Sequence, residues 1–229
     1  KTVMDFSFFD KVNTAKNEQT DTWFKGLDRV YNNFVYDYLY PNPASVLAFI
    51  ENHDTDRFLG EGENLDMLKQ ASTLLLTTRR IPQLYYGTEV MMNGVKSKSD
   101  GYVRKDFPGG WTDDKENALT PEGRTRLQNE SYNFYRNLLN WRKGNDVIAK
   151  GSMKQFMVQH GVYAYARQYK GKTVFVLLNG TDKEVKLPLK YYAEVLKDKT
   201  QGKDVISGKV TALNEELTMA PRQSMVIEL

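Results

Sequence analysis

The sequence predicts an α/β part over residues 1–146, followed by an all-β antiparallel part over residues 147–229. Strand-like and helix-like patterns alternate up to about residue 145, and from about residue 151 the apolar residues recur with the period of strands. A third observation concerns function. The polar triplet Asn52-His53-Asp54 directly follows the short apolar run 45–50, which is typical of a parallel strand buried on both faces. Active-site groups of α/β barrels lie at such strand-to-loop junctions.

Three short runs in the α/β part are expected to form parallel strands. They cover residues 2–8, 45–50 and 81–86. Each strand is followed by a segment with a helical pattern or by a long polar loop that leads into one, so the order is that of consecutive βα units. The loop from Val90 to Leu119 is longer than most connections, which favours a ligand-binding role over a simple link.

A helix is expected after each strand. The first is predicted from Trp23 to Tyr38, where apolar residues fall at helical spacing after a Thr20-Asp21 cap signal. The second is predicted from Asn64 to Arg79. For the third, Thr120-Pro121-Glu122 provides a cap, a proline at the first helical position and an acid in the first turn, and Gly144 ends the helix.

The remaining residues are expected to form an antiparallel sandwich. Its strands are predicted at residues 153–158, 162–169, 172–178, 184–187 and 223–229. Hairpin signals occur at His160-Gly161, Lys170-Gly171 and Asn179-Gly180. Three tyrosines at even spacing, Tyr163, Tyr165 and Tyr169, share one face of a strand, where packing is favoured over stacking on a sugar.

Composition excludes several classes of function. The net charge of +3 comes from 32 basic and 29 acidic residues that are interspersed, so no basic stripe for nucleic acid is present. The chain contains no cysteine, which excludes disulfides and thiolate metal sites. No apolar run reaches the length of a membrane span, so no membrane insertion is expected. The first residues lack the layout of a signal peptide, and the chain is expected to begin inside a longer protein.

Three segments resemble the α-amylase superfamily of retaining α-glucan hydrolases and transferases. Residues 49–54 resemble the stretch after the seventh barrel strand of that family, and residues 81–89 resemble its eighth strand and exit. Residues 99–111 are most similar to neopullulanases and cyclomaltodextrinases of Gram-negative starch-utilisation systems. The resemblance implies the C-terminal part (about strands 6–8) of a TIM (β/α)8 barrel followed by an antiparallel β-sandwich, because three strands alone cannot close a barrel.

The resemblance also implies roles for the polar triplet. Retaining glycoside hydrolysis needs a carboxylate nucleophile and a general acid, which the superfamily supplies after its fourth and fifth strands, and neither segment is present here. Asp54 corresponds to the third carboxylate, a transition-state stabiliser that hydrogen-bonds sugar hydroxyls, while His53 contacts the same ring and Asn52 helps to hold the loop. The triplet alone, without the rest of the chain, favours a strand-ending loop with a capping aspartate over an active-site role.

Further candidates lie in the loop after the last barrel strand. By resemblance, Asp100 and Arg104 contact a sugar on the non-reducing side of the cleavage point; the alternative is a surface ion pair. Trp111 either stacks on a glucose face or anchors the loop. His160 is expected to be a polar turn residue.

The sequence therefore predicts a glycoside hydrolase acting on α-glucosidic bonds of pullulan, maltodextrins or cyclodextrins, present as a fragment that is inactive alone. The alternative is a non-catalytic glucan-binding module. The expected partner is an α-glucan oligosaccharide, with a homodimer possible in the complete enzyme. No cofactor and no metal site is expected in this chain, and the calcium sites of related amylases would lie in the missing part. The nearest resemblance favours the periplasm, with the cytoplasm as the alternative.

Overall fold

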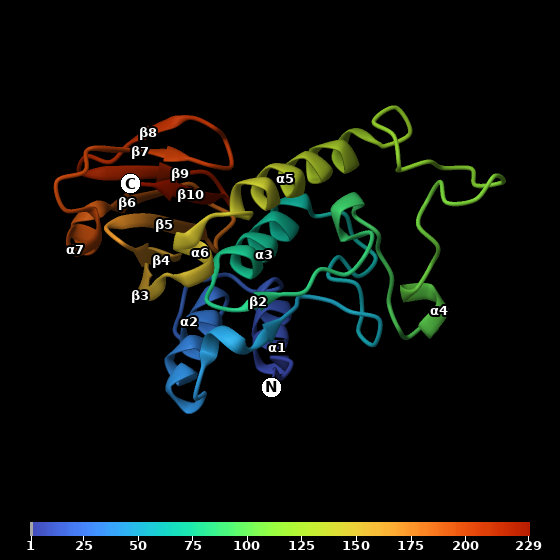
Figure 1. Ribbon diagram of the computed structural model, residues 1–229, viewed down its shortest axis with the longest axis horizontal. Helices are drawn as coiled ribbons and strands as arrows, with labels where there is room; N and C mark the ends of the chain where they lie inside the picture. The colour runs from blue at the N-terminus through green and yellow to red at the C-terminus, as the bar shows by residue number, and fades with distance from the viewer. Residues whose placement is uncertain (1) are drawn as a thin grey trace.

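A computed structural model describes residues 2–229 of the chain. Helices grouped around short parallel strands form one part, and an antiparallel sheet packs against them, as Figure 1 shows. The helices of the first part are α1 (Phe6–Ala15), α2 (Leu27–Val35), α3 (Leu65–Thr77), α4 (Asp100–Val103), α5 (Arg126–Arg142) and α6 (Asp146–Lys150). Within residues 2–229, none of the helices has the length and apolarity that crossing a membrane requires.

The parallel strands lie in the predicted order but are much shorter than predicted. β1 (Leu47–Ala48) pairs in parallel with β2 (Ile81–Pro82), and Met4 forms a parallel bridge with Leu47. The backbone N–H of Asp5 donates to Leu47 O, and that of Gln83 donates to Ala48 O, both at 2.8 Å. These bonds lie on opposite sides of β1, so the three segments are consecutive neighbours, as successive βα units require.

The strand predicted over residues 2–8 is wrong beyond Asp5, because α1 begins there. The Asp5 carboxylate accepts the backbone N–H of Phe8 at 2.9 Å and caps the helix. Phe8 is fully buried, with its ring centroid 5.9 Å from that of Phe34 on α2. The cap and this helix-to-helix packing outweigh the β-propensity of the aromatic run.

Two predicted helix starts are displaced, and both errors have a local cause. α2 begins at Leu27, after Gly26 in a left-handed conformation at φ 54°, so Trp23 lies in the preceding turn. α5 begins after Thr125, whose side chain forms a capping box with Gln128; this cap outweighs the signal at Thr120-Pro121-Glu122. By contrast, α3 begins directly after Asn64, as predicted.

The second part is built on a six-stranded antiparallel sheet. In spatial order its strands are β3 (Ser152–Gln159), β4 (Val162–Tyr169), β5 (Lys172–Asn179), β10 (Ser224–Glu228), β7 (Gln201–Asp204) and β8 (Val210–Ala212). A separate pair consists of β6 (Val185–Pro188) and β9 (Glu216–Met219), and the short helix α7 (Ala193–Leu196) lies between β6 and β7 in the chain. The hairpins at His160-Gly161 and Lys170-Gly171 are confirmed, and all four of these residues have the positive φ that tight two-residue turns require.

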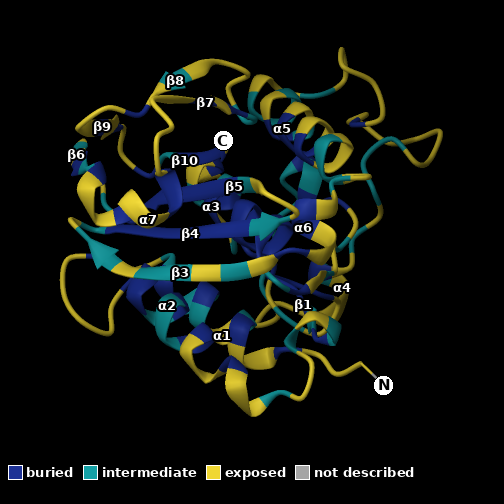
Figure 2. Cartoon of the chain, turned by 60° about the vertical axis from the view of Figure 1, so that its left-hand side comes forward, coloured by how far each residue is buried: buried dark blue, intermediate teal, exposed yellow. Residues whose placement is uncertain are grey.

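The two parts share one hydrophobic core. Phe8, Val30 and Leu75 of the helices belong to the same buried cluster as Tyr163 and Tyr165 of β4. The expectation that these tyrosines pack is confirmed, because both are fully buried. A second cluster, which includes Phe175 and Tyr192, fills the opposite side of the sheet. Figure 2 shows β4 and β5 buried along most of their length, as the central layer between these clusters.

Candidate active site

The polar triplet lies in the loop after β1, where the chain passes from buried to exposed. Phe49 and Ile50 are buried, Asn52 is buried as well, and the side chains of His53 and Asp54 are exposed. The Asn52 side-chain oxygen accepts the backbone N–H of Asp54 at 2.8 Å. This Asx-type turn holds the backbone in a fixed bend. Asn52 thus sets the conformation in which His53 and Asp54 face solvent.

Asp54 is surrounded by groups from its own loop, after β1, and from the chain that follows β2. Its Oδ2 lies 3.2 Å from His53 Nε2, and its Oδ1 lies 3.0 Å from Arg104 Nη2. Arg104 also donates from Nε to the backbone oxygen of His53 at 2.8 Å, and its Nη2 lies 3.4 Å from Asp100 Oδ2. The structure therefore brings together the candidates Asn52, His53, Asp54, Asp100 and Arg104. Arg104 contacts Asp54 itself and not only its neighbour Asp100.

Lys96 is a member of this group that sequence reasoning missed. Its ammonium lies 3.2 Å from Asp100 Oδ1 and donates to the backbone oxygen of Asp54 at 3.1 Å. Its backbone N–H donates to Asp56 Oδ1 at 2.6 Å, which ties the loop after β2 to the loop after β1. A lone lysine in a polar loop carries no sequence signal that distinguishes it from other surface lysines.

A buried ion pair lies beneath the exposed group, and it was also missed. Arg57 Nη1 and Glu51 Oε1 are 3.2 Å apart, and both side chains are almost fully buried. Glu51 also accepts from the Thr88 hydroxyl and from the backbone N–H of Phe58. Burial raises the pKa of the Glu51 carboxyl, against the opposing effect of these donors.

Arg57 links three segments of the site. Its guanidinium donates to Tyr86 O at 2.7 Å and to Val103 O at 2.9 Å, and its centre lies 4.0 Å from the centroid of the Tyr85 ring. Its own backbone N–H donates to Gly94 O at 3.0 Å. The segment that follows β2 and the end of α4 are therefore fixed against the loop that carries Asp54. The available sequence signal was the presence of two charged residues close to a buried strand.

Trp111 is placed differently from the other candidates. It lies in the loop between α4 and α5, which extends away from the body of the molecule in Figure 1. Its indole is 64% exposed, and its backbone N–H donates to Asp114 at 3.1 Å. Within residues 2–229 the Trp111 side chain is not part of the contact network around Asp54, so its role stays a prediction.

The exposed group suits hydroxyl ligands better than a metal ion. Its two carboxylates, Asp54 and Asp100, are both paired with cations, and within residues 2–229 no three or more His, Cys, Asp or Glu side chains are placed so that they could hold a metal ion. Carboxylates accept hydrogen bonds, whereas guanidinium and imidazole groups donate them, so together they match the two-sided hydrogen bonding of a sugar hydroxyl.

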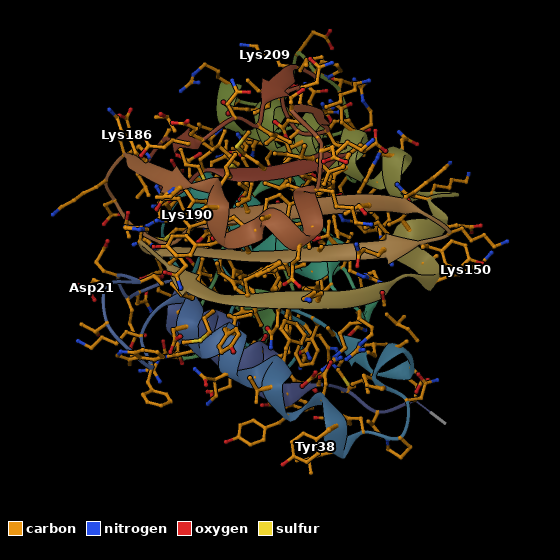
Figure 3. The ribbon with its side chains drawn as sticks, turned by 90° about the vertical axis from the view of Figure 1, so that its left-hand side faces the viewer. Asp21, Tyr38, Lys150, Lys186, Lys190 and Lys209 are labelled. Carbon is orange, nitrogen blue, oxygen red and sulfur yellow. The ribbon has the colours of Figure 1, made fainter. Side chains whose placement is uncertain are left out.

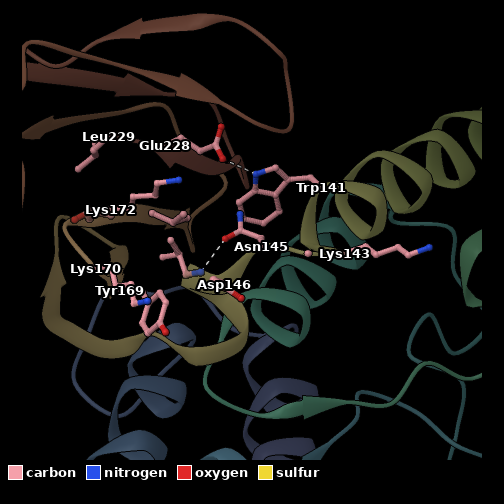
Figure 4. Close-up of a pocket in the computed structure, with 13 residues that line it drawn as sticks. Trp141, Lys143, Asn145, Asp146, Tyr169, Lys170, Lys172, Glu228 and Leu229 are labelled. Carbon is pink, nitrogen blue, oxygen red and sulfur yellow. Dashed lines mark hydrogen bonds between the residues drawn. The ribbon is translucent and has the colours of Figure 1, made fainter.

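Apart from the Asp54 group, the surface has a hollow of about 630 Å³ where α5 and α6 meet the sheet. Figure 4 shows the indole N–H of Trp141 bonded to Glu228 Oε1, at 2.8 Å, and the Asn145 side chain capping α6. The bond between Trp141 and Glu228 connects α5 to β10. None of the residues that line this hollow belongs to the group around Asp54.

Comparisons with known proteins find relatives for most of the chain. Residues 153–228 match the family described as the cyclo-malto-dextrinase C-terminal domain. An α-amylase of Niallia circulans is 29% identical over 220 residues, which cover 93% of this chain and 38% of the relative. A cyclomaltodextrin glucanotransferase of Thermoanaerobacterium thermosulfurigenes is 32% identical over 177 residues, or 77% of this chain and 22% of the relative. The chain thus spans well under half the length of these relatives.

Solved structures show the same fold. The α-amylase of Geobacillus thermoleovorans matches with a TM-score of 0.77 at 19% identity, over 100% of this chain and 48% of that one. An Anoxybacillus α-amylase matches with a TM-score of 0.76 at 18% identity, over 99% and 46%. The predicted fold class, the C-terminal part of a TIM barrel followed by an antiparallel β-sandwich, is confirmed. The chain is therefore similar in sequence to α-amylases and cyclomaltodextrin glucanotransferases, and its residues 153–228 match the cyclo-malto-dextrinase C-terminal domain.

Proposed function

We propose that the chain is the C-terminal portion of a retaining glycoside hydrolase that cleaves α-glucosidic bonds of starch-type glucans. Its activity would be that of a neopullulanase or cyclomaltodextrinase acting on pullulan, maltodextrins or cyclodextrins. One observation carries the proposal: the Asp54 carboxylate lies at the carboxyl end of β1, with His53 and Arg104 around it. The names of the relatives, which are α-amylases and cyclomaltodextrin glucanotransferases, support the same class.

Asp54 would act on the sugar ring as charge develops. The transition state of glycoside hydrolysis resembles an oxocarbenium ion, and a fixed carboxylate near the ring stabilises its positive charge. The Asp54 carboxylate would also accept hydrogen bonds from ring hydroxyls, while His53 donates to a neighbouring one. The Asn52 turn and the Arg57–Glu51 pair hold the loop before substrate arrives, so little reorganisation is needed during the reaction.

The nucleophile and the general acid would come from the part of the enzyme that precedes this chain. Retaining enzymes hold these two carboxyl groups about 5–5.5 Å apart across the scissile bond. In the group around Asp54, the second carboxylate, Asp100, is joined to Asp54 through Arg104, and we assign it neither of these two roles. The isolated chain is accordingly proposed to be inactive.

The Asp54→Asn variant of the complete enzyme tests this proposal. It retains the size of the side chain but removes the charge that stabilises the cationic ring. We expect kcat on maltodextrin to fall at least about a thousandfold with a much smaller change in KM, because the interaction is stronger in the transition state than in the ground state.

Asp66→Asn serves as the matched control, since Asp66 is an exposed carboxylate in the first turn of α3. It should leave both kinetic constants nearly unchanged. If Asp54→Asn retained most of its kcat, Asp54 would be a structural residue. A complete protein that bound maltodextrin without hydrolysing it would instead be a glucan-binding module.

A further inference from the structure

A pocket separate from the Asp54 group lies between the loop that joins α1 to α2 and the turn between β3 and β4. Its volume of about 400 Å³ falls within the ~300–1,000 Å³ typical of small-molecule sites. It is lined by Asp21, Thr22 and Trp23 from the loop and by Val158 and His160 from the hairpin. Figure 3 places Asp21 at the edge where the N-terminal helices meet the sheet. Both parts of the molecule therefore contribute to the pocket.

Trp23 is exposed, although the loop that carries it is firmly held. Its side chain is 69% exposed. The loop is fixed at its start by Glu18, which accepts from Arg29 Nε at 2.6 Å and from the backbone N–H of Gly26 at 2.8 Å. The backbone N–H of Thr20 donates to Gly180 O at 3.0 Å, which fixes the loop against the sheet.

The turn next to Trp23 adopts a costly backbone conformation. Phe24 has φ 60°, in the left-handed region that residues other than glycine rarely adopt. Its backbone N–H donates to the carboxylate of Asp28, a buried residue of α2, at 2.6 Å, and this bond holds the conformation. A large aromatic side chain exposed on a rigid and strained turn is typical of a binding surface that is formed before its ligand arrives.

The lining of the pocket selects the chemistry of the ligand. Its ionisable residues are Asp21, Asp28 and His160, and neither lysine nor arginine lines it. An anionic ligand such as a phosphate would therefore meet negative charge without a compensating cation. A neutral polyhydroxylated ring fits better. Its C–H face can pack on the indole, and its hydroxyls can donate to the Asp21 carboxylate and accept from His160.

We propose that this pocket is a second glucan-binding site, in which Trp23 is the platform and Asp21 and His160 bind the hydroxyls. The identity of the ligand as an α-glucan rests on the proposed function, whereas its neutral saccharide character rests on the pocket. A long glucan held here stays attached to the enzyme between cleavage events, which raises its effective concentration at the active site. Short oligosaccharides gain nothing from this attachment.

Affinity electrophoresis of the complete enzyme in native gels that contain amylose tests the site. An Asp54→Asn background prevents digestion of the amylose during the run. We expect Trp23→Ala to weaken amylose binding at least about tenfold, the loss typical of truncating a binding hot spot. Trp23→Phe retains an aromatic face and should retain part of the affinity.

Tyr38→Ala is the matched control, because Tyr38 is 76% exposed but does not line the pocket. It should migrate like the parent protein. Amylose binding that is unchanged in Trp23→Ala would overturn the site. A change of oligomeric state in Trp23→Ala, measured by light scattering, would identify the surface as a protein interface and would also overturn it.

Two further measurements separate this inference from the proposed function. In the otherwise wild-type enzyme, Trp23→Ala should leave maltotriose hydrolysis unchanged, and its loss would show that Trp23 acts on the active site or on the fold. Retardation by a β-glucan instead of amylose, abolished by Trp23→Ala, would overturn the α-glucan assignment. If the wild-type enzyme failed to hydrolyse any starch-type glucan but still bound amylose through Trp23, the proposed function would fail and this site would stand.

Discussion

Glu18 shows how one side chain fixes the loop that presents Trp23. Its carboxylate accepts two hydrogen bonds from Arg29, at 2.6 and 2.7 Å, and a third from the backbone of Gly26. The bonds from Arg29 are the main cause of a lowered pKa of the Glu18 carboxyl, against the opposing effect of burial. Since the folded pKa lies below the unfolded value of 4.5, this group stabilises the folded state above about pH 4.5. That stabilisation is lost as the pH falls through the folded pKa.

We expect Glu18→Gln to lower the free energy of unfolding by about 1 kcal/mol near pH 7, the size of a partly exposed but bidentate ion pair. The difference from the wild type should shrink as the pH falls below about 4.5, because the wild-type carboxyl then becomes protonated as well. Urea unfolding at several pH values measures it. Glu63→Gln, which changes another exposed glutamate, is the control and should show no such dependence. An effect of Glu18→Gln that is equal at pH 7 and pH 3 would contradict the assignment.

The residues around Asp54 differ in how far the sequence could reveal them. Asn52, His53 and Asp54 form a local pattern after an apolar run, so they could be identified as candidates without a structure. The Arg57 contacts could not, because the acceptors Tyr86 O and Val103 O lie 29 and 46 positions away in the chain. Backbone carbonyls have no residue identity, and a sequence therefore gives no sign of which ones a buried arginine will bind.

At the scale of elements, several local signals predicted the structure correctly, whereas strands that depend on non-local pairing were not predicted. The start of α3 is set by the cap Asn64, and the tight hairpins by residues that tolerate positive φ. The strands β7, β8 and β9 were not predicted. β7, with the sequence Gln-Gly-Lys-Asp, has no β-prone residue and owes its conformation to pairing with β10 and β8. Such pairing depends on sheet register, which periodicity does not encode.

Arg167 of β4 joins elements of the two parts through four hydrogen bonds. Its guanidinium donates to Thr77 O and Thr78 O, both at 2.8 Å, and to Ile148 O and Gly151 O at 2.9 and 2.8 Å. These carbonyls lie at the carboxyl ends of α3 and α6, where a positive charge also suits the helix dipole. Burial lowers the pKa of Arg167 to about 10, so the group stays charged at neutral pH.

We expect Arg167→Met to lower the free energy of unfolding by at least about 3 kcal/mol, because buried carbonyls then lose their donor and each costs about 1–3 kcal/mol. Arg167→Lys keeps the charge but not the planar fork of the guanidinium. Its free energy of unfolding should therefore lie between those of the wild type and Arg167→Met. Urea unfolding followed by circular dichroism measures the loss. Arg136→Met, which removes an exposed arginine of α5, is the control. If Arg167→Met were as stable as the control, the carbonyls would find other partners and Arg167 would not join the parts.

At the scale of the whole molecule, the helices and the sheet are bound by both apolar and polar contacts. The buried cluster that includes Tyr163 and Tyr165 lies between the helices and the sheet, and we call it the inner cluster. Its residues come from α1, α2, α3 and α5 and from β4, β5 and β10. Within it, the Tyr165 hydroxyl lies 2.6 Å from Thr77 Oγ1. The buried Gln70 side chain of α3 also donates to Asn179 O of β5, at 2.9 Å. Neither part can expose its face of this cluster without leaving the other part's apolar face in water, so the free energy of opening should be common to both.

Native-state hydrogen exchange of the complete protein measures this coupling. Amides in the middle of α3 and of β4 should exchange with the same free energy of opening. Tyr165→Leu, in the shared cluster, should lower both values equally, by about 2–4 kcal/mol for a large core residue.

Tyr192→Leu provides the matched comparison. Tyr192 belongs to the second buried cluster, which lies on the side of the sheet that faces away from the helices. If the parts open as one unit, this variant too should lower the protection of α3 and β4 together. Loss of protection in β4 with α3 unchanged would show that the sheet opens alone. The pocket lined by Trp23 would then be disrupted in the partly open state, since part of its lining, including Val158 and His160, comes from the β3–β4 hairpin.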